Sequence, residues 1–366
     1  MQSALTRAWV DVDVGALLRN GARVIEHTGA RLLPMVKADA YGLGATRVAC
    51  ALQELDPWGF GVATVEEGDD LRRAGIERPI VVFTPLVLEE LDAARRARLT
   101  PTLGSAEAID AWRQTGLPWH LAVDTGMNRA GVSWRAVAAL HDLIASFPPQ
   151  GVFTHFHSAE RNDGSRRTQE ERFASVIDAL PVRPQMVHAE NSPAIERHGR
   201  DGSRQWTVAR PGIFLYGVAS GNGAEITPEP VVSLRARVVD LRTIEPGDTV
   251  SYGATYRPDS PRRIATLAIG YADGYRRALS NIGTVLVRGK RARVAGLITM
   301  DMTMIDVTDI ACEIGDVATL IGADGGDQLS VAEVAAAGGL SPYEMLTGLR
   351  SRLSHRFLGE DSRRGK

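Results

Sequence analysis

Two hydrophobic patterns divide the chain. From residue 31 to about residue 217, short apolar runs alternate with amphipathic stretches in which apolar positions recur every three and four residues. From residue 231 onward, several segments alternate apolar and polar residues with a period of two. The sequence therefore predicts a domain of parallel strands and helices over residues 1–225 and a β-rich domain over residues 226–366.

Eight apolar runs in the first domain are predicted as strands. They cover residues 32–37, 58–63, 80–83, 100–104, 119–124, 151–156, 185–189 and 207–214. Amphipathic stretches such as 65–75 and 168–180 are expected to form helices between them. Eight strand and helix units within about 200 residues predict a (β/α)8 barrel, which carries its active site at the C-terminal ends of the strands.

Polar side chains lie at or just after those predicted strand ends. They are Lys37, Asp124, His155, His157, His188 and Arg210. Because the strand ends of a barrel converge on one rim, we expect these residues to form a site there.

The β-rich domain is expected to end in helical segments. An Ala-rich stretch covers residues 331–339, and Ser341, Pro342 and Glu344 form a predicted capping box. Tyr343 is therefore expected on the first turn of a helix.

Charge and composition favour a small-molecule ligand. The 366 residues include 42 Lys and Arg against 44 Asp and Glu, a formal net charge of −2, and no long basic run that would indicate nucleic acid or an anionic membrane as partner. No apolar run is long enough for a signal peptide or a membrane span. Cys50 and Cys312 lack metal-ligand spacing, so we expect no metal site built on them and a reducing cytoplasm as the location.

A primary amine has only three possible sources, Lys37, Lys290 and Lys366. Lys37 follows an apolar strand and precedes a Gly-containing loop over residues 38–44, so its amine is expected in the barrel mouth. A desolvated lysine has a lowered pKa and becomes nucleophilic. The alternative is a lysine that only extends to solvent.

The segment MVKADAYGLG (35–44) resembles the lysine segment of the alanine racemases. Seven further segments resemble other blocks of that family, in the same order and at comparable spacing. They are DTGMNRAG (124–131), THFHSAE (154–160), HAENSPA (188–194), RPGIFLYG (210–217), VSYGATY (250–256), IGYADGYRR (269–277) and MDMTMIDVTD (300–309). The resemblance implies a pyridoxal-phosphate enzyme with a barrel and a β domain.

The resemblance also implies two catalytic residues. Lys37 would bind pyridoxal 5'-phosphate as a Schiff base and then move a proton on one face of the substrate aldimine. Tyr252 would be the base on the opposite face, because racemisation needs an acid or base on each side of the α carbon. The reaction would interconvert L-alanine and D-alanine, and the D-alanine would supply peptidoglycan.

The remaining site residues carry over from the same family pattern. Arg210 would face the pyridine nitrogen, where a permanent cation disfavours protonation of the ring. Arg129 and Met300 would bind the substrate carboxylate. The other cofactor-binding residues implied by the resemblance are Tyr41, His155, Asn191, Ser192, Gly212, Ile213 and Tyr343.

The family pattern further implies a homodimer in which Tyr252 comes from the other subunit. One departure concerns Arg129, because Ala122 stands where many members have a lysine that positions this arginine. Arg129 must therefore be positioned in another way.

Two other readings stay open at this point. His155 and His157 form an HxH pattern that, with His188 and Asp124, would suit a metal-dependent barrel hydrolase. A pyridoxal-phosphate carrier built on the barrel alone is the second alternative. The segments VSYG and MDMT of the β-rich domain would have no use in such a carrier.

Overall fold

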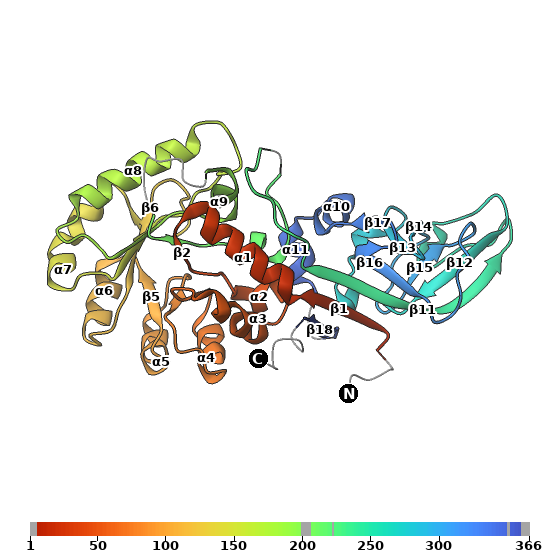
Figure 1. Ribbon diagram of the computed structural model, residues 1–366, viewed down its shortest axis with the longest axis horizontal. Helices are drawn as coiled ribbons and strands as arrows, with labels where there is room; N and C mark the ends of the chain where they lie inside the picture. The colour runs from red at the N-terminus through yellow and green to blue at the C-terminus, as the bar shows by residue number, and fades with distance from the viewer. Residues whose placement is uncertain (1–5, 199–205, 222, 350–351, 360–366) are drawn as a thin grey trace. The chain divides into compact units, whose positions relative to one another are not determined.

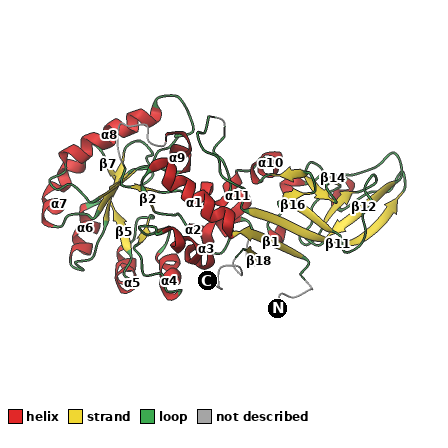
Figure 2. Cartoon of the chain, in the orientation of Figure 1, coloured by secondary structure: helices red, strands yellow, loops and turns green. Residues whose placement is uncertain are grey.

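The computed structural model describes residues 6–198, 206–221, 223–349 and 352–359, and its chain forms two compact units (Figure 1). The barrel unit comprises Leu17–Ala40 and Ala45–Glu229. The β unit comprises Met1–Ala16, Tyr41–Gly44 and Pro230–Lys366. Figure 2 shows the helices in red and the strands in yellow. The boundary near residue 225 stays a prediction.

The barrel unit contains the parallel strands predicted from the apolar runs. They are β2 (Arg31–Leu32), β3 (Phe60–Val62), β4 (Ile80–Val82), β5 (Thr100–Leu103), β6 (His120–Asp124), β8 (Gly151–Phe153), β9 (Met186–His188) and β10 (Val208–Ala209), with β7 (Val132–Ser133) beside β6. β10 pairs with β2, and a parallel bridge from Met35 to Gly61 joins the β2 segment to β3. The Thr207 N–H donates to the Val187 carbonyl and connects β10 to β9. The sheet therefore closes, and the predicted (β/α)8 barrel is confirmed.

Helices follow these strands along the chain. The α-helices are α1 (Val14–Thr28), α2 (Lys37–Gly42), α3 (Ala45–Leu52), α4 (Val65–Arg73), α5 (Leu91–Arg96), α6 (Ala106–Arg113), α7 (His141–Ser146), α8 (Ser165–Ala179) and α9 (Ser192–His198). The short 3-10 helices are η1 (Gln53–Leu55), η2 (Leu88–Glu90), η3 (Val137–Leu140) and η4 (Ile213–Tyr216). Thr64 and Ser105 cap α4 and α6 because their side-chain oxygens accept a backbone N–H of the first turn.

The β unit is built around an antiparallel sheet. Its strands are β1 (Ala8–Asp13), β11 (Val232–Ile244), β12 (Arg262–Leu267), β13 (Thr284–Val287), β14 (Lys290–Val294), β15 (Thr303–Asp306), β16 (Val317–Asp324), β17 (Asp327–Leu329) and β18 (Ser354–Leu358). β16 pairs with both β13 and β11, so the strands from β11 to β16 close into a second barrel. β18 adds to β1 in parallel.

Helical turns complete the β unit. They are η5 (Tyr252–Ala254), η6 (Tyr271–Asp273), η7 (Arg277–Leu279), α10 (Val331–Ala337) and α11 (Pro342–Thr347). The predicted capping box is confirmed: Ser341 Oγ accepts the Glu344 N–H, and the Glu344 carboxylate accepts the Ser341 N–H. Tyr343 lies on the first turn of α11, as expected.

The barrel strands are shorter than their predicted ranges, and two of them differ most. The strand predicted over residues 32–37 ends as β2 at Leu32, and Lys37 instead begins α2. The strand predicted over 207–214 ends at Ala209, before Pro211. Proline has no N–H for a sheet ladder, and Pro34 and Pro211 lie just after these strand ends.

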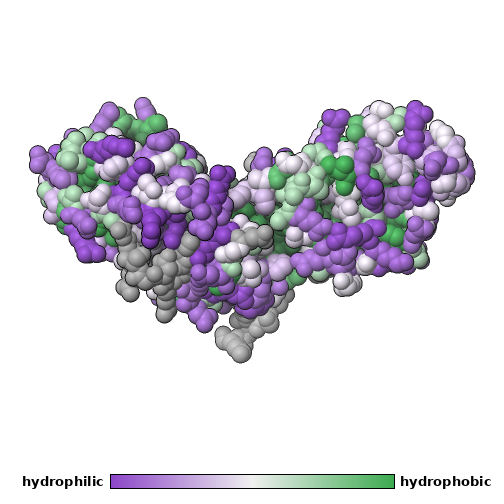
Figure 3. All heavy atoms as spheres, turned by 90° about the horizontal axis from the view of Figure 1, so that it is seen from above, coloured by the Kyte–Doolittle hydropathy of each residue, from purple (hydrophilic) through white to green (hydrophobic). Residues whose placement is uncertain are grey.

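On the face drawn in Figure 3, hydrophobic residues are interspersed with hydrophilic ones. Within the described ranges, every helix is too short or too polar to span a bilayer.

Candidate active site

Lys37 lies in the barrel unit in surroundings that disfavour a charged amine. Burial is the main cause that lowers the pKa of Lys37, and the positive charges of Arg129 and Arg210 lower it further. Glu67 acts in the opposite direction. A lysine in such surroundings has a larger fraction of neutral, nucleophilic amine than one exposed to water.

The residues after Lys37 form a left-handed turn. Ala38, Asp39, Ala40 and Tyr41 have φ values of 52°, 56°, 52° and 58°, and Gly42 has 87°. The turn is nevertheless hydrogen-bonded, because the Ala40 N–H donates to the Val36 carbonyl at 2.8 Å. A left-handed conformation costs about 1 to 2 kcal/mol for each non-glycine residue. Contacts from other elements must therefore hold this segment.

Two carboxylates of the barrel unit hold the start of the turn. Glu67 on α4 accepts the N–H groups of Ala38 and Ala63, both at 2.7 Å. Asp39 accepts the Ala45 N–H at 2.7 Å and links the turn to the start of α3. Glu67 is thus a positioning residue for Lys37 that sequence reasoning missed.

The end of the turn packs within the β unit. A Cβ atom at Gly42 would lie 2.5 Å from the Leu346 carbonyl oxygen, so only glycine fits this backbone. His355 Nε2 lies 2.9 Å from the Gly42 carbonyl oxygen. The rings of Tyr41 and Tyr343 lie 6.0 Å apart, and burial raises the pKa of Tyr41. Tyr41 and Tyr343, both predicted near the cofactor phosphate, are therefore neighbours.

Arg210 is a buried cation in the barrel unit. Its Nη2 donates to the carbonyl oxygens of Thr154 and Ala189 at 2.8 and 3.0 Å, and its Nη1 lies 2.7 Å from His188 Nδ1. Burial lowers the pKa of Arg210 to about 9, with Glu190 opposing the shift. The guanidinium therefore stays charged at neutral pH and is fixed in orientation.

The three histidines of the strand ends do not form a metal site. Burial lowers the pKa of His155 to about 3, with smaller effects from Arg210, Arg129 and Lys37, so its ring is neutral. His157 is exposed and its Nδ1 pairs with Ser158 Oγ. His188 is buried and engaged by Arg210. In the part of the chain that the structure describes, no group of three or more His, Cys, Asp or Glu side chains is arranged to bind a metal.

Ser192 and the η4 loop form a candidate anion pocket. Ser192 Oγ accepts the N–H groups of Gly212 and Phe214 at 2.9 and 3.3 Å. A hydroxyl has two acceptor positions and one hydrogen, so the Ser192 hydrogen remains available to a ligand. Ile213 begins η4, and the helix itself does not use its N–H. Gly212 was predicted to donate to the phosphate, but in this structure its N–H is directed to Ser192.

Asn191 shapes the same pocket from the preceding position. Its Nδ2 donates to the Phe156 carbonyl at 3.1 Å, and its Oδ1 accepts the Ala194 N–H at 3.3 Å. The side chain therefore connects the β8 loop to the first turn of α9.

Arg129 is presented on a loop that is held by backbone hydrogen bonds. Asp124 Oδ1 accepts the N–H groups of Gly126 and Asn128 at 2.8 and 3.1 Å. A Cβ at Gly131 would lie 2.8 Å from the Ala122 carbonyl oxygen, so the far end of the loop packs directly on β6. Arg129 itself is exposed. The Asp124 carboxylate thus holds the loop that carries Arg129, in a chain that has alanine at residue 122.

Tyr252 projects from the β unit. It begins η5 and is 74% exposed, the highest value among its large hydrophobic residues. The backbone around it is fixed by Ser251, which has a φ of 63° and donates from Oγ to the Leu297 carbonyl at 2.6 Å. A cavity of about 780 Å³ is lined by Tyr252, Thr299 and Met302. The backbone at Tyr252 is therefore held in place, while the Tyr252 ring is exposed to solvent.

Tyr256 and Tyr271 are the tyrosines nearest to Tyr252 in the sequence. Tyr256 donates to Asp306 at 2.8 Å, and burial together with that carboxylate raises its pKa to about 12. Tyr256 is therefore a poor base near neutral pH. Tyr271 is 40% exposed and begins η6.

Met300 lies in a loop tied to η6. The carbonyls of Thr299 and Met300 accept the N–H groups of Tyr271 and Ala272 at 3.0 and 3.1 Å. Met300 is 52% exposed, so its position is set by backbone bonds.

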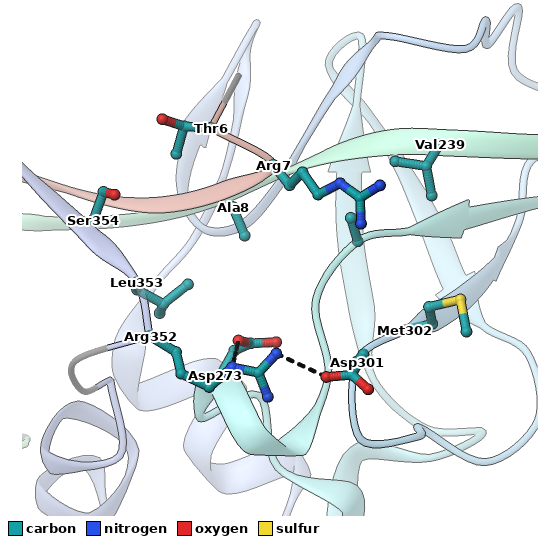
Figure 4. A pocket seen from close by; sticks show the side chains of 11 residues that line it. Thr6, Arg7, Ala8, Val239, Asp273, Asp301, Met302, Arg352, Leu353 and Ser354 are labelled. Carbon is teal, nitrogen blue, oxygen red and sulfur yellow. Dashed lines mark hydrogen bonds and ion pairs between the residues drawn. The ribbon is translucent and has the colours of Figure 1, made fainter. Parts of the chain in front are cut away.

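Asp301, the next residue along that loop, pairs with Arg352, which also pairs with Asp273. Figure 4 draws both ion pairs as dashed lines at the edge of a second cavity of the β unit.

Sequence profiles of known families match both units. The profile for the alanine racemase N-terminal domain matches residues 12–220, and that for the alanine racemase C-terminal domain matches residues 231–357. An alanine racemase from Deinococcus radiodurans is 41% identical over 359 residues, which cover 96% of this chain and 99% of the relative.

Solved structures agree over the same length. Alanine racemase from Bacillus anthracis with bound L-Ala-P has a TM-score of 0.89 and 30% identity, covering 98% of this chain and 96% of that chain. Alanine racemase from Bartonella henselae with covalently bound pyridoxal phosphate has a TM-score of 0.88 and 30% identity, covering 96% and 100%. A one-domain carrier and a metal hydrolase do not fit matches that span both units. The chain belongs to the alanine racemase family.

Proposed function

We propose that this protein is a pyridoxal-phosphate-dependent racemase that interconverts L-alanine and D-alanine. The observation that carries the proposal is Lys37, whose amine is partly buried among cations in a chain that matches both domains of the alanine racemase family. The residues suit the cofactor: a nucleophilic amine, a buried cation at Arg210, and a Ser192 hydroxyl with a free hydrogen for a phosphate. When bound, pyridoxal phosphate supplies the electron-withdrawing ring that acidifies the α hydrogen of an attached amino acid.

Lys37 has two tasks in this proposal. Its neutral amine bonds the cofactor and, after the substrate amine takes its place, accepts or returns a proton at the α carbon. Burial and the nearby arginines favour the neutral amine that accepts a proton, and Glu67 fixes the turn that begins beside it.

Arg210 determines whether the pyridine nitrogen of the cofactor is protonated. It holds a full positive charge next to the expected position of the pyridine nitrogen, so protonation of that nitrogen is disfavoured. Negative charge at the α carbon is then delocalised less, and reprotonation competes better with side reactions such as transamination. His155, neutral beside the ring, adds no further cation.

The phosphate is assigned to the pocket around Ser192 and Ile213. Asn191 shapes this pocket, and Gly212 supports it by holding Ser192. Tyr41 and Tyr343 stay predicted phosphate contacts from the family pattern, and their rings are neighbours within the β unit.

The second base and the carboxylate contacts come from exposed groups. Tyr252 accepts or donates the proton on the face opposite Lys37, and Arg129 with the Met300 backbone binds the carboxylate of alanine. Each of these three residues is exposed in the single chain, which supports a homodimer in which Tyr252 reaches the site of the other subunit. Free cysteines at positions 50 and 312 agree with a cytoplasmic location, where D-alanine would enter peptidoglycan synthesis.

Racemisation of L-alanine by the purified protein with pyridoxal phosphate tests the activity. Borohydride reduction should attach the cofactor to Lys37, and peptide mapping that finds it on Lys290 would overturn the assignment. Tyr252→Phe should slow racemisation about 10² to 10⁴-fold, because a full turnover needs both bases. Tyr256→Phe is the matched control and should remain active, since its hydroxyl is bonded to Asp306.

Mixing two inactive variants tests the shared site. Lys37→Ala and Tyr252→Phe subunits that exchange at random form half heterodimers, and each heterodimer has one intact site of two. Activity should therefore recover to about one quarter of the wild-type value. No recovery from variants shown to exchange subunits would mean that Lys37 and Tyr252 act within one chain.

A further inference from the structure

Arg210 begins a chain of buried imidazoles in the barrel unit. Its Nη1 lies 2.7 Å from His188 Nδ1, and His188 Nε2 lies 2.9 Å from His120 Nδ1. His120 and His188 are fully buried, and Arg210 is 4% exposed. His120 lies on β6 and His188 on β9, 68 residues apart in sequence.

The chemistry of arginine fixes every proton in this chain. A guanidinium has donors only, so His188 Nδ1 must present a lone pair to it. The single hydrogen of neutral His188 then lies on Nε2 and is donated to His120 Nδ1. His120 must in turn hold its own hydrogen on Nε2. A protonated His188 would place two N–H groups against each other at 2.7 Å, which the contact excludes.

The far end of the chain has a matching acceptor. His120 Nε2 is a buried atom without a hydrogen-bond partner among the described residues, and Gln150 Oε1 is another. Gln150 raises the pKa of His120, against the larger lowering by burial and by Arg210, so its side chain lies near the imidazole. The predicted donor and the unsatisfied acceptor therefore complement each other.

We infer that His120 is a positioning residue for Arg210 and acts through His188. By accepting the His188 hydrogen, His120 keeps the His188 lone pair directed at the guanidinium and strengthens it as an acceptor. Arg210 uses three of its five N–H donors in these contacts: one on Nη1 toward His188, and two on Nη2 toward the carbonyls of Thr154 and Ala189. The Nε hydrogen and one Nη1 hydrogen remain for a ligand. This inference rests on the proposed role of Arg210 toward the cofactor ring.

The proton positions can be measured without any turnover. In the holoenzyme labelled with ¹⁵N-histidine, His120 and His188 should both give the signals of neutral rings protonated at Nε2, unchanged between pH 5 and pH 9. His120→Asn identifies the His120 signal by its loss. An Nδ1-protonated or charged ring at either position would overturn the inference, whatever the enzyme's activity.

Variants test whether the chain acts on Arg210. His120→Asn can still accept from His188, and it should keep the ratio of pyruvate formed to alanine racemised near the wild-type value. His120→Leu removes the acceptor and should raise that ratio about tenfold or more, in the range of other supporting-residue changes. His27→Leu, which alters a histidine of α1 that pairs with Glu225, is the matched control and should not change it.

The outcomes separate this inference from the function itself. An unchanged ratio in His120→Leu, with wild-type racemisation normal, would refute the role of His120 and leave the racemase assignment intact. Absence of racemisation in the wild type would refute the assignment, while the ¹⁵N signals would still decide the proton positions. If His120→Leu does not fold, the wild-type ¹⁵N signals remain decisive for the proton positions on which the inference rests.

Discussion

The left-handed turn after Lys37 lowers the stability of the protein, and a glycine substitution in it should raise the free energy of unfolding. Ala38 is exposed, has a φ of 52° and makes its hydrogen bond to Glu67 through the backbone N–H, which glycine would keep. Ala38→Gly removes a left-handed penalty of about 1 to 2 kcal/mol and adds about 0.5 to 1 kcal/mol of backbone entropy cost. The free energy of unfolding should therefore rise by about 0.5 to 1 kcal/mol.

Ala22→Gly provides the matched control. Ala22 is also exposed, but it lies in the middle of the right-handed helix α1. The same change there should lower the free energy of unfolding by about 1 kcal/mol. The two variants are therefore expected to move in opposite directions.

Urea unfolding of the cofactor-free proteins, followed by circular dichroism, measures both effects. The Ala38→Gly midpoint should lie above the wild-type midpoint, and the Ala22→Gly midpoint should lie below it. Equal destabilisation by the two changes would refute the reasoning, because it would mean that Ala38 bears no left-handed penalty. Racemisation by Ala38→Gly should fall, since the residue beside Lys37 becomes freer to move.

Three further outcomes follow from the same geometry. Gly42→Ala should destabilise the protein by about 3 kcal/mol or more, because its Cβ would meet the Leu346 carbonyl, whereas Gly75→Ala, at the same φ of 87° with open space, should cost about 1 to 2 kcal/mol in urea unfolding. Arg210→Glu should slow racemisation and raise pyruvate formed per racemisation event, and an unchanged ratio would contradict the role of Arg210. Lys37→Met should raise the unfolding free energy of the cofactor-free protein at pH 7, since burial disfavours the charged amine. That gain should shrink toward pH 10.5, where the unfolded chain also loses its proton, and a gain independent of pH would be inconsistent with the lowered pKa.

The barrel strands were predictable because each is buried on both faces, so its residues form a short contiguous apolar run in the sequence. Ile80, Val81 and Val82 in β4 are all fully buried, and turn residues bound the run on both sides. The strand at residues 32–37 was predicted too long: regular strand pairing ends near Pro34, which has no N–H for a ladder, and only single backbone hydrogen bonds such as Met35 N–H to the Pro211 carbonyl continue beyond it. The short strands β1 and β18 were not predicted. They pair with distant partners, so local pattern holds little information about them.

The residues that support the site were harder to predict from the sequence than the groups they support. Lys37 and Arg210 stood out because charged residues rarely follow buried strands. Glu67 looked like one of several acidic residues at a helix start, and its contact with Ala38 spans 29 residues. His120 had a usable signal, since strand alternation places it on the same face as Asp124. Its partner His188 could not be assigned without the barrel register.

The turn after Lys37 shows why local propensity failed at the centre of the site. The residues Ala-Asp-Ala-Tyr would favour a right-handed helix or an ordinary loop, and four left-handed residues cost on the order of 4 to 8 kcal/mol. That conformation is held by Glu67 at its start and by the close packing of Gly42 at its end. Strain of this kind persists only where surrounding structure determines the backbone completely. The turn begins at Lys37, so the fold is less stable at the residue whose amine is proposed to react.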